Sequence, residues 1–198
     1  MPSLLNSTHL FQDAITEHIA VVQGLMGQQS NLERIAKEMC RALFSGGKIL
    51  WCGNGGSAAD SQHMAAELMG RFRRERRGLP SIALTTDTSI LTAIGNDYGY
   101  EKVFQRQVEA LCLPGDVVVG ISTSGNSKNV CAALETANQM GAFTAALTGS
   151  QGGQMAGIAA VTLRVPSNDT ARIQEGHVLC GHLLCDWVEL SIMEGNEP

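Results

Sequence analysis

The first 46 residues and the rest of the chain carry two different hydrophobic patterns. In the first part, apolar residues recur at spacings of one to four, and no Gly or Pro cluster interrupts them before Gly46-Gly47, which is typical of helices. The apolar positions of the first helix are Leu10, Phe11, Ile15, Ile19, Val22 and Leu25. A second helix is predicted from Leu32 to Phe44, ending at the glycine pair. Residues 1–46 are therefore expected to form an N-terminal helical hairpin.

From residue 47 onward, short apolar runs alternate with segments that favour helices. The runs are continuously apolar, as strands are when both faces of a parallel sheet are covered. The predicted strands are Lys48–Cys52, Ser81–Thr85, Asp116–Ile121, Phe143–Leu147 and Val161–Val165. The predicted helices are Ala58–Phe72, Glu101–Leu111, Asn126–Met140 and Ala171–Glu194. The sequence thus predicts an α/β fold with a five-stranded parallel sheet flanked by helices. One domain is expected over residues 1–198, with its α/β core over residues 47–198.

Three polar loops of small residues follow predicted strands: Gly53–Ser57, Thr85–Asp87 and Ser122–Ser127. Ligands of such sheets bind outside the carboxyl ends of the strands. In the last loop, hydroxyl groups and free backbone amides meet at the start of a predicted helix, a setting that suits a phosphate. A single hydroxyl would suffice for ordinary helix capping, which is the alternative interpretation. Several hydroxyls in one loop favour phosphate binding.

The loop Gly53–Ala58 contains the pattern G-x-G-x-x-A of dinucleotide-binding folds. Those folds place an acidic residue about 20 residues further on, at the end of the next strand. Here the next predicted strand ends near Asp87, well beyond that spacing, and the Walker pattern is absent. A tight turn that lets the backbone approach a polar ligand is favoured over a nucleotide site.

Two predicted helices carry residues typical of acid–base or metal chemistry. His63 and Glu67 are four residues apart and share a helix face. On the C-terminal helix, a rotation of roughly 100° per residue lets Gln174 and His182 converge on one site more easily than His177 and His182. From spacing alone, a surface pair for His63 and Glu67 and a core position for His182 remain alternatives to a shared site.

Composition and charge narrow the classes of function. The 22 Gly among 198 residues exceed average usage, and several lie in the loops after apolar runs. A net charge of −5 argues against a general nucleic-acid binder, whose affinity rests on basic residues facing phosphates. The sequence has no signal-peptide pattern and no apolar stretch long enough for a membrane span. Six dispersed cysteines without a CxxC pair are typical of reduced, cytosolic thiols.

Taken together, the motifs resemble the phosphoheptose isomerase family, whose members have the sugar-isomerase domain fold. The resemblance is carried by Cys52–Ser57, the helix with His63 and Glu67, the Gly95-Asn96-Asp97 turn, Ser122–Ser127, and Arg172–Glu175 leading to His182. It implies a cytoplasmic homotetramer, with sites near subunit interfaces, that converts sedoheptulose 7-phosphate to D-glycero-D-manno-heptose 7-phosphate. That reaction would be the first step toward ADP-heptose for the lipopolysaccharide core.

The resemblance also implies roles for individual residues. Glu67 would be the base that moves a proton between C1 and C2 of the sugar, and His182 its acid partner. The phosphate and nearby hydroxyls would be held by Ser57, Ser122, Thr123, Ser124 and Ser127. The sugar site would be completed by Asn54, Gly55, Gly56, Asn96, Asp97 and Gln174, with Glu67. One zinc ion per subunit would be bound by His63, Glu67, Gln174 and His182.

The chemistry of an aldose–ketose isomerase agrees with these roles but leaves the part played by zinc open. The reaction needs one group that removes a carbon-bound proton and another that protonates or polarises the oxygens of an enediol. A carboxylate that binds a metal is a weaker base, whereas zinc would polarise a carbonyl. Zinc is therefore expected either to be structural or to release Glu67 during turnover.

Two non-catalytic proteins of the same fold are alternatives. A scaffold that associates with the bacterial replication initiator keeps the Gly-rich and Ser-rich loops but lacks residues matching Glu67 and His182, both of which are present here. A sugar-phosphate sensor is usually joined to a DNA-binding domain, and the N-terminal helices here contain no basic recognition helix. The sequence therefore favours an enzyme over either alternative.

Two features stay outside this interpretation. Ala171 precedes Arg172 at a position where some family members have an acidic residue, so a contact from such a side chain is not expected here. The segment Arg71–Arg77 contains five arginines, which fit either a solvated face or an interface strip.

Overall fold

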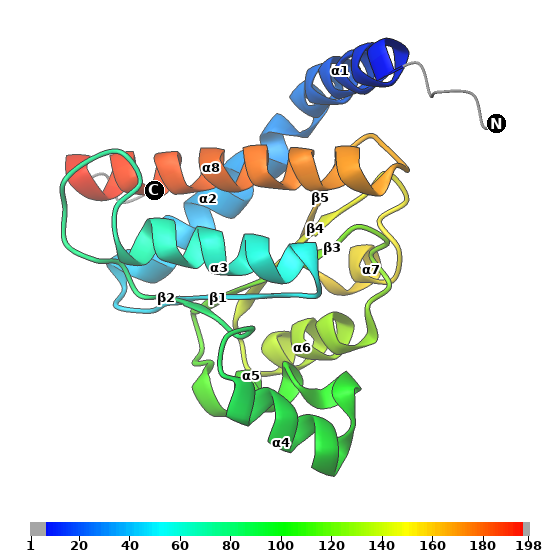
Figure 1. Ribbon diagram of the computed structural model, residues 1–198. Helices are drawn as coiled ribbons and strands as arrows, with labels where there is room; N and C mark the ends of the chain where they lie inside the picture. Colours follow the sequence, from blue (N-terminus) through cyan, green and yellow to red (C-terminus); the bar gives the residue numbers. More distant parts are fainter. Residues whose placement is uncertain (1–6, 196–198) are drawn as a thin grey trace.

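Five parallel strands form one sheet in the order β2-β1-β3-β4-β5 in the computed structural model, which describes residues 7–195 (Figure 1). They are β1 (Ile49–Gly53), β2 (Ser81–Ala83), β3 (Val117–Ser122), β4 (Phe143–Thr148) and β5 (Val161–Arg164). All five predicted strands are confirmed, with ends shifted by one or two residues. Lys48 and Asp116 lie just before β1 and β3, where their side chains form an ion pair with Nζ 2.6 Å from Oδ2.

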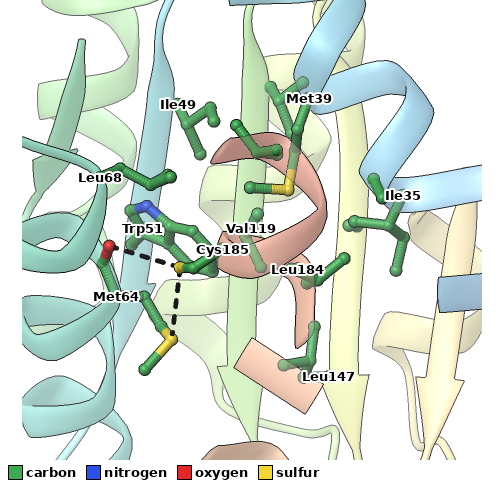
Figure 2. Packing of buried hydrophobic residues seen from close by; sticks show 14 of the residues in the cluster. Ile35, Met39, Ile49, Trp51, Met64, Leu68, Val119, Leu147, Leu184 and Cys185 are labelled. Atoms are coloured by element: carbon green, nitrogen blue, oxygen red, sulfur yellow. Dashed lines mark hydrogen bonds between the residues drawn. The ribbon is translucent and has the colours of Figure 1, made fainter. Parts of the chain in front are cut away.

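Helices cover both faces of this sheet because alternate strand residues point to opposite sides. One layer contains α2 (Gln29–Phe44), α3 (Gly56–Met69) and α8 (Thr170–Glu194), and the other contains α5 (Gln105–Leu111) and α6 (Lys128–Gln139). In β1, Ile49 and Trp51 belong to the core beneath the first layer, which Figure 2 shows from close by. Leu50 belongs to the core on the other side. The continuous apolar runs therefore reflect burial on both faces, and the predicted α/β fold is confirmed.

The two N-terminal helices are present, but they do not fold back on each other as the expected hairpin. α1 (Ser7–Gly24) continues through a 3-10 turn, η1 (Leu25–Gln28), into α2, and it extends away from the sheet (Figure 1). The backbone stays in the right-handed helical region at Gly24 and Gln29, so the chain bends between the helices instead of reversing. α1 contacts α8, where Nδ1 of His18 lies 2.7 Å from a carboxylate oxygen of Glu175.

A helix after β2 was not predicted. α4 (Thr88–Tyr98) includes the three residues Gly95-Asn96-Asp97, so the expected turn at these residues is wrong. The side chain of Asp87 caps this helix by accepting a hydrogen bond from the backbone N–H of Ile90 at 2.9 Å. The loop Thr85–Asp87 thus ends in a helix cap. From the sequence alone, these polar residues were interpreted only as a ligand loop.

The helix predicted over Glu101–Leu111 is shorter and is divided. A 3-10 turn, η2 (Tyr100–Lys102), precedes α5, and the two meet around Val103 and Phe104, which are buried in the core. A four-residue helix, α7 (Met155–Ile158), was also not predicted. Within residues 7–195, no helix combines the length and apolar character that crossing a bilayer requires.

The ends of the other helices depend on the loops beside them. α3 ends at Met69 instead of the predicted Phe72, because Gly70 follows and the guanidinium of Arg76 donates to the last carbonyl groups of the helix. α6 begins at Lys128, since the Ser-rich loop continues to the cap position before it. α8 begins one residue earlier than predicted, where the Asp169 side chain accepts from the Arg172 backbone.

Candidate active site

The carboxyl ends of β1 and β3 lie side by side, since Gly53 of β1 pairs with Ile121 of β3. β2 lies beyond β1, whereas β4 and β5 lie beyond β3, so the strand order reverses direction between β1 and β3. Such a switch point is where open parallel sheets bind ligands. The Gly-rich loop after β1 and the Ser-rich loop after β3 therefore meet at the place that the topology favours.

Asn54 joins these two loops. Its side-chain amide exchanges two hydrogen bonds with that of Asn129 in the first turn of α6, one donated by Asn54 Nδ2 at 2.8 Å and one donated by Asn129 Nδ2 at 2.9 Å. The hydroxyl of Tyr100 donates to the same Asn54 oxygen at 3.3 Å. The amide of Asn54 thus fixes the Gly-rich loop against α6.

Three hydroxyl groups converge in the Ser-rich loop. Ser122 Oγ lies 2.9 Å from Ser127 Oγ and 3.4 Å from Ser124 Oγ, and Ser124 Oγ accepts a hydrogen bond from the backbone of Asn126. Ser127 occupies the cap position of α6, yet its side chain makes no capping hydrogen bond. Ordinary capping therefore does not explain these hydroxyls, which remain available to an anion at the helix N-terminus. Thr123 lies in the same loop, and its carbonyl accepts a hydrogen bond from the backbone of Gly149.

α3 and α8 lie close enough for side chains of both to share one site. Gly181 of α8 contacts Met64 of α3 so closely that a Cβ at position 181 would overlap the Met64 sulfur. Nearer the start of both helices, the amide of Gln174 packs against Gly56. The two helices therefore run in the same direction across the sheet (Figure 1).

His63, Glu67 and His182 form a compact polar cluster on these two helices. Nε2 of His63 lies 3.1 Å from Oε1 of Glu67 and 3.4 Å from Nε2 of His182. One ligand atom from each residue lies within 4.8 Å of the others. Burial lowers the pKa of His182, His63 lowers it further, and Glu67 acts in the opposite direction. His182 is therefore biased toward the neutral imidazole, the form that accepts a proton or binds a metal.

Gln174, the fourth predicted metal ligand, lies apart from this cluster. It precedes His182 by eight residues, which corresponds to about 12 Å along the helix axis, and its amide contacts Gly56. Gln174 and His182 nevertheless line the same open groove, together with His18 and Glu175. The structure thus brings three of the four predicted ligands together and leaves Gln174 beside the Gly-rich loop.

Comparisons with known proteins identify the family of this chain. Residues 11–149 match the SIS domain family. The phosphoheptose isomerase of Aquifex aeolicus is 56% identical over 185 residues, which cover 93% of this chain and 95% of that protein. The chain belongs to the phosphoheptose isomerase family.

Solved structures of this family share the fold over nearly the whole chain. Phosphoheptose isomerase GmhA from Neisseria gonorrhoeae superposes with a TM-score of 0.88 at 46% identity, covering 93% of this chain and 100% of that one. A phosphoheptose isomerase from Francisella tularensis gives a TM-score of 0.90 at 37% identity, covering 94% of this chain and 100% of that one. The family resemblance predicted from the motifs is thereby confirmed.

The remaining family residues predicted for the site lie on α3 and α4. Ser57 is buried in the first turn of α3, directly after Gly55 and Gly56. Asn96 donates a hydrogen bond to Asp97 at 2.8 Å on the exposed side of α4. Within residues 7–195, no hydrogen bond joins Asn96 or Asp97 to the cluster or to the Ser-rich loop.

Sequence reasoning missed several residues that border the site, of which Asp60 carried a readable signal. Asp60 precedes His63 by three residues and Glu67 by seven, so the three share one face of α3. One of its carboxylate oxygens is buried without a hydrogen-bond partner. Burial raises the pKa of Asp60, and the neighbouring His63 acts in the opposite direction. Tyr100 and Asn129 come to Asn54 only through the fold, and no short motif predicts them.

Proposed function

We propose that this chain converts D-sedoheptulose 7-phosphate to D-glycero-D-manno-heptose 7-phosphate by proton transfer through an enediol. The observation that carries the proposal is the close placement of a carboxylate and an imidazole, Glu67 and His182, on two helices, of which α3 begins directly at the Gly-rich loop. This combination supplies the two groups that an aldose–ketose isomerase requires. Membership of the phosphoheptose isomerase family specifies the sugar. A scaffold or a sensor needs neither side chain and is not favoured.

The phosphate of the substrate would be anchored by the Ser-rich loop. Its hydroxyls and backbone amides lie at the N-terminal end of α6, where the helix dipole favours an anion. This anchor requires no lysine, so it is compatible with the net charge of −5. Binding energy from the phosphate would orient the carbons at the other end of the sugar.

The reacting carbons would lie near the cluster on α3 and α8. The axis of α3 rises from Gly56 by about 10 Å to His63 and by roughly 16 Å to Glu67, so the sugar would extend along α3 from the ligand loops toward the cluster. Glu67 would remove the proton from one of the two carbons and return it to the other. His182 would move a proton between the two oxygens of the enediol, and its lowered pKa favours the neutral form that can accept one.

The donor set of the cluster fits zinc. Two imidazole nitrogens and a carboxylate are ligands that catalytic zinc sites use, with a fourth position left open, and here these atoms lie within 4.8 Å of one another. His63, Glu67 and His182 would hold the ion, one per subunit, and Gln174 lines the adjoining groove. When bound, zinc would polarise the carbonyl oxygen of the sugar. Glu67 can act as the base only while its carboxylate is free of the metal.

We also propose a homotetramer in the cytoplasm that acts early in lipopolysaccharide core synthesis. An unpartnered apolar face supports assembly: on α1 the side chains of Leu10 and Phe11 are 67% and 70% exposed. The side chain of His63 is 43% exposed in one copy of the chain, so a neighbouring subunit would help to enclose the site. All six cysteines are free and buried, which agrees with a reducing compartment.

The central test compares the carboxylate of Glu67 with one outside the site. Purified protein is expected to convert sedoheptulose 7-phosphate to an aldoheptose 7-phosphate. Glu67→Gln should lower kcat by about a hundredfold or more, because a lost general base removes that much rate. Glu109→Gln alters an exposed carboxylate on α5 that contacts the surface residues Gln105 and Arg106, and it should turn over like the unmodified protein.

Two results would overturn this proposal. Undiminished activity of Glu67→Gln would remove Glu67 from the mechanism. Absence of any conversion by the unmodified protein, with and without added zinc, would reject isomerase activity itself. Far-ultraviolet circular dichroism of both variants separates a chemical effect from a loss of fold.

A further inference from the structure

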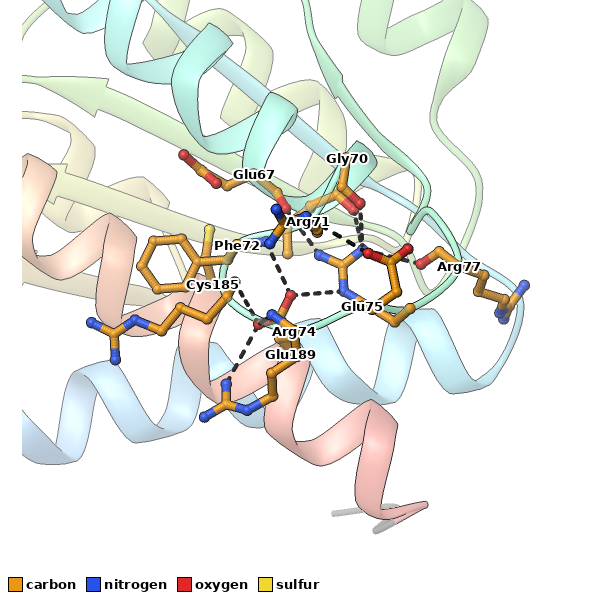
Figure 3. A network of polar contacts seen from close by, with 12 residues as sticks. Glu67, Gly70, Arg71, Phe72, Arg74, Glu75, Arg77, Cys185 and Glu189 are labelled. Atoms are coloured by element: carbon orange, nitrogen blue, oxygen red, sulfur yellow. Dashed lines mark hydrogen bonds and ion pairs between the residues drawn. The ribbon is translucent and has the colours of Figure 1, made fainter.

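The arginine-rich segment 71–77 is held by a buried carboxylate of α8. Glu189 is fully buried, and its carboxylate accepts hydrogen bonds from three successive backbone N–H groups, those of Phe72 (3.0 Å), Arg73 (2.9 Å) and Arg74 (2.9 Å). Figure 3 shows this network, with the loop wrapped around the Glu189 side chain. Hydrogen bonds to a charged acceptor are roughly twice as strong as those between neutral groups. The loop therefore has one defined position relative to α8.

Arg76 ties the same carboxylate to the end of α3. Its Nε lies 3.2 Å from Oε1 of Glu189, and its side chain is only 4% exposed. Its terminal nitrogens donate to the backbone carbonyls of Glu67 at 2.9 Å and Leu68 at 2.9 Å. The side chain of Glu67 itself points away from this network (Figure 3). Glu189 and Arg76 thus connect α8, which carries His182, to the last turn of α3, which carries Glu67.

Phe72 links the Glu189 network to the cluster of His63, Glu67 and His182. Its backbone N–H is one of the three that Glu189 holds, and its ring stacks on the imidazole of His182 with centroids 5.3 Å apart and planes inclined by 29°. His182 also meets His63 edge to face, with ring centroids 4.9 Å apart. The imidazole of His182 therefore contacts two rings, and Glu189 holds the backbone of one of them, that of Phe72, in place.

We propose that Glu189 is a positioning residue for His182, acting through the loop 71–77 and the ring of Phe72. Glu189 lies seven residues after His182, two turns along the same face of α8. One helix therefore carries both the imidazole and the carboxylate that positions the Phe72 ring stacked on it. This inference rests on the proposed function, since it gives the orientation of His182 a role in the isomerisation. The network also gives a role to three of the five arginines, which form ion pairs with Asp186 or Glu189.

Kinetics of two matched variants test this proposal. Glu189→Gln keeps the shape of the side chain and removes its charge, so the loop should lose its defined position. We expect kcat to fall by about tenfold or more, as for other residues that orient active-site groups, with little change in KM because the Ser-rich loop is unaltered. Asp186→Asn breaks ion pairs to Arg73 and Arg74 but leaves the three backbone hydrogen bonds in place. It should behave like the unmodified protein.

A spectroscopic readout separates positioning from general stability. In protein labelled with ¹³C at histidine Cε1, the His182 signal can be assigned by its absence in His182→Asn. Ring-current shielding by Phe72 should be lost in Phe72→Leu and retained in Phe72→Tyr. Glu189→Gln should move the signal toward its position in Phe72→Leu, whereas Asp186→Asn should not move it.

The outcomes are distinguishable. An unshifted His182 signal or an unchanged kcat in folded Glu189→Gln would overturn the proposal. If that variant does not fold, the Phe72 pair decides: Phe72→Leu must lower kcat and shift the signal, and Phe72→Tyr must restore both, otherwise the proposal is rejected. If the unmodified protein shows no isomerase activity, the proposed function fails, while the His182 signal still tests the positioning by itself.

Discussion

At the scale of single residues, burial decides the behaviour of His177. This histidine of α8 is 2% exposed, and burial lowers its pKa to about 4, while the backbone of Thr148 acts in the opposite direction. The unfolded chain binds a proton at this residue near the ordinary histidine pKa of about 6.5, whereas the folded chain does not. Protonation between those two values therefore favours the unfolded chain.

We expect the free energy of unfolding to fall as the pH drops from about 6.5 toward 4, because the pKa of His177 is lowered in the folded state. The stabilisation associated with neutral His177 is fully present above pH 6.5. By pH 5 the free energy of unfolding should have fallen by about 2 kcal/mol. Urea unfolding of the unmodified protein and of His177→Gln at pH 7 and pH 5 measures it. His9→Gln, at an exposed histidine of α1, is the control and should keep the full pH dependence. Equal pH dependence in all three proteins would contradict the prediction.

The three side chains of the cluster also make a prediction at this scale. Protein purified without a chelator should contain one zinc ion per chain by elemental analysis, and His63→Ala should contain much less, because one of the three clustered ligands is lost. His18→Ala, at a histidine that lines the same groove as His182 but pairs with Glu175, serves as control and should retain the metal. Equal zinc in His63→Ala would place the ion elsewhere.

At the scale of elements, the Ser-rich loop depends on a second loop behind it. Gly125 has φ +67°, a region that favours glycine, and a Cβ there would overlap the backbone of Gly152 in the loop after β4. The carbonyl of Gly125 also accepts a hydrogen bond from the backbone of Met155 at 2.9 Å. Both loops therefore pack backbone against backbone, which fixes the hydroxyls of Ser122, Ser124 and Ser127.

Gly125→Ala should raise KM by about tenfold or more, because the hydroxyl-bearing loop must move to make room for the methyl group. Gly115→Ala is a matched control: Gly115 also has positive φ, +88°, but nothing lies within 4 Å of the added methyl group, and the residue precedes the amino end of β3, whereas the Ser-rich loop follows its carboxyl end. Steady-state kinetics of both variants is the measurement. A similar KM in the two variants would show that the backbone contact does not shape the substrate site.

Elements with strong periodicity were predictable, and connections between elements were not. The five strands, α6 and α8 follow from apolar runs and helical spacing, so their positions agree closely with prediction. The end of α3 is different, because the guanidinium of Arg76, bound to a carboxylate more than a hundred residues away, decides where this helix stops. α4 was missed although Leu91 and Ile94 pack against the core at helical spacing, because Gly95-Asn96-Asp97 was taken for a turn.

The same distinction holds for the candidate site. His63 and Glu67 share one helix, so their proximity could be predicted from a spacing of four residues. Their meeting with His182 depends on the close contact of Gly181 with Met64, which no local pattern contains. The family resemblance supplied that pairing before the structure did, and residues outside the family motifs, such as Phe72 and Glu189, could be found only from contacts in space.

At the scale of the whole molecule, α1 extends from the body with an apolar surface that the chain itself does not cover. Met26, just beyond this helix, is 78% exposed, and Ile15 and Ile19 are about half exposed. Exposed apolar surface of this kind marks interfaces between proteins. It fits assembly through the N-terminal helices, whose extension away from the sheet replaces the expected hairpin.

Light scattering coupled to size exclusion should therefore give four times the chain mass of 21.0 kDa. Leu10→Asp should shift the protein toward smaller species, because a charge would be buried in the interface. Leu113→Asp changes a leucine of nearly equal exposure, 62%, in the turn before β3, and should leave the mass unaltered. A monomer for the unmodified protein, or equal effects of both variants, would contradict an interface through α1.

The fold of the arginine-rich loop also has a consequence for proteolysis. Trypsin cleaves after arginine, and the segment Arg71–Arg77 offers it five such bonds in a stretch without helix or strand. Cleavage requires the backbone to leave its native position, and here that movement breaks three hydrogen bonds to Glu189 and exposes a buried charge. The rate of cutting in this loop therefore reports how often the backbone of residues 72–74 leaves the Glu189 carboxylate under native conditions.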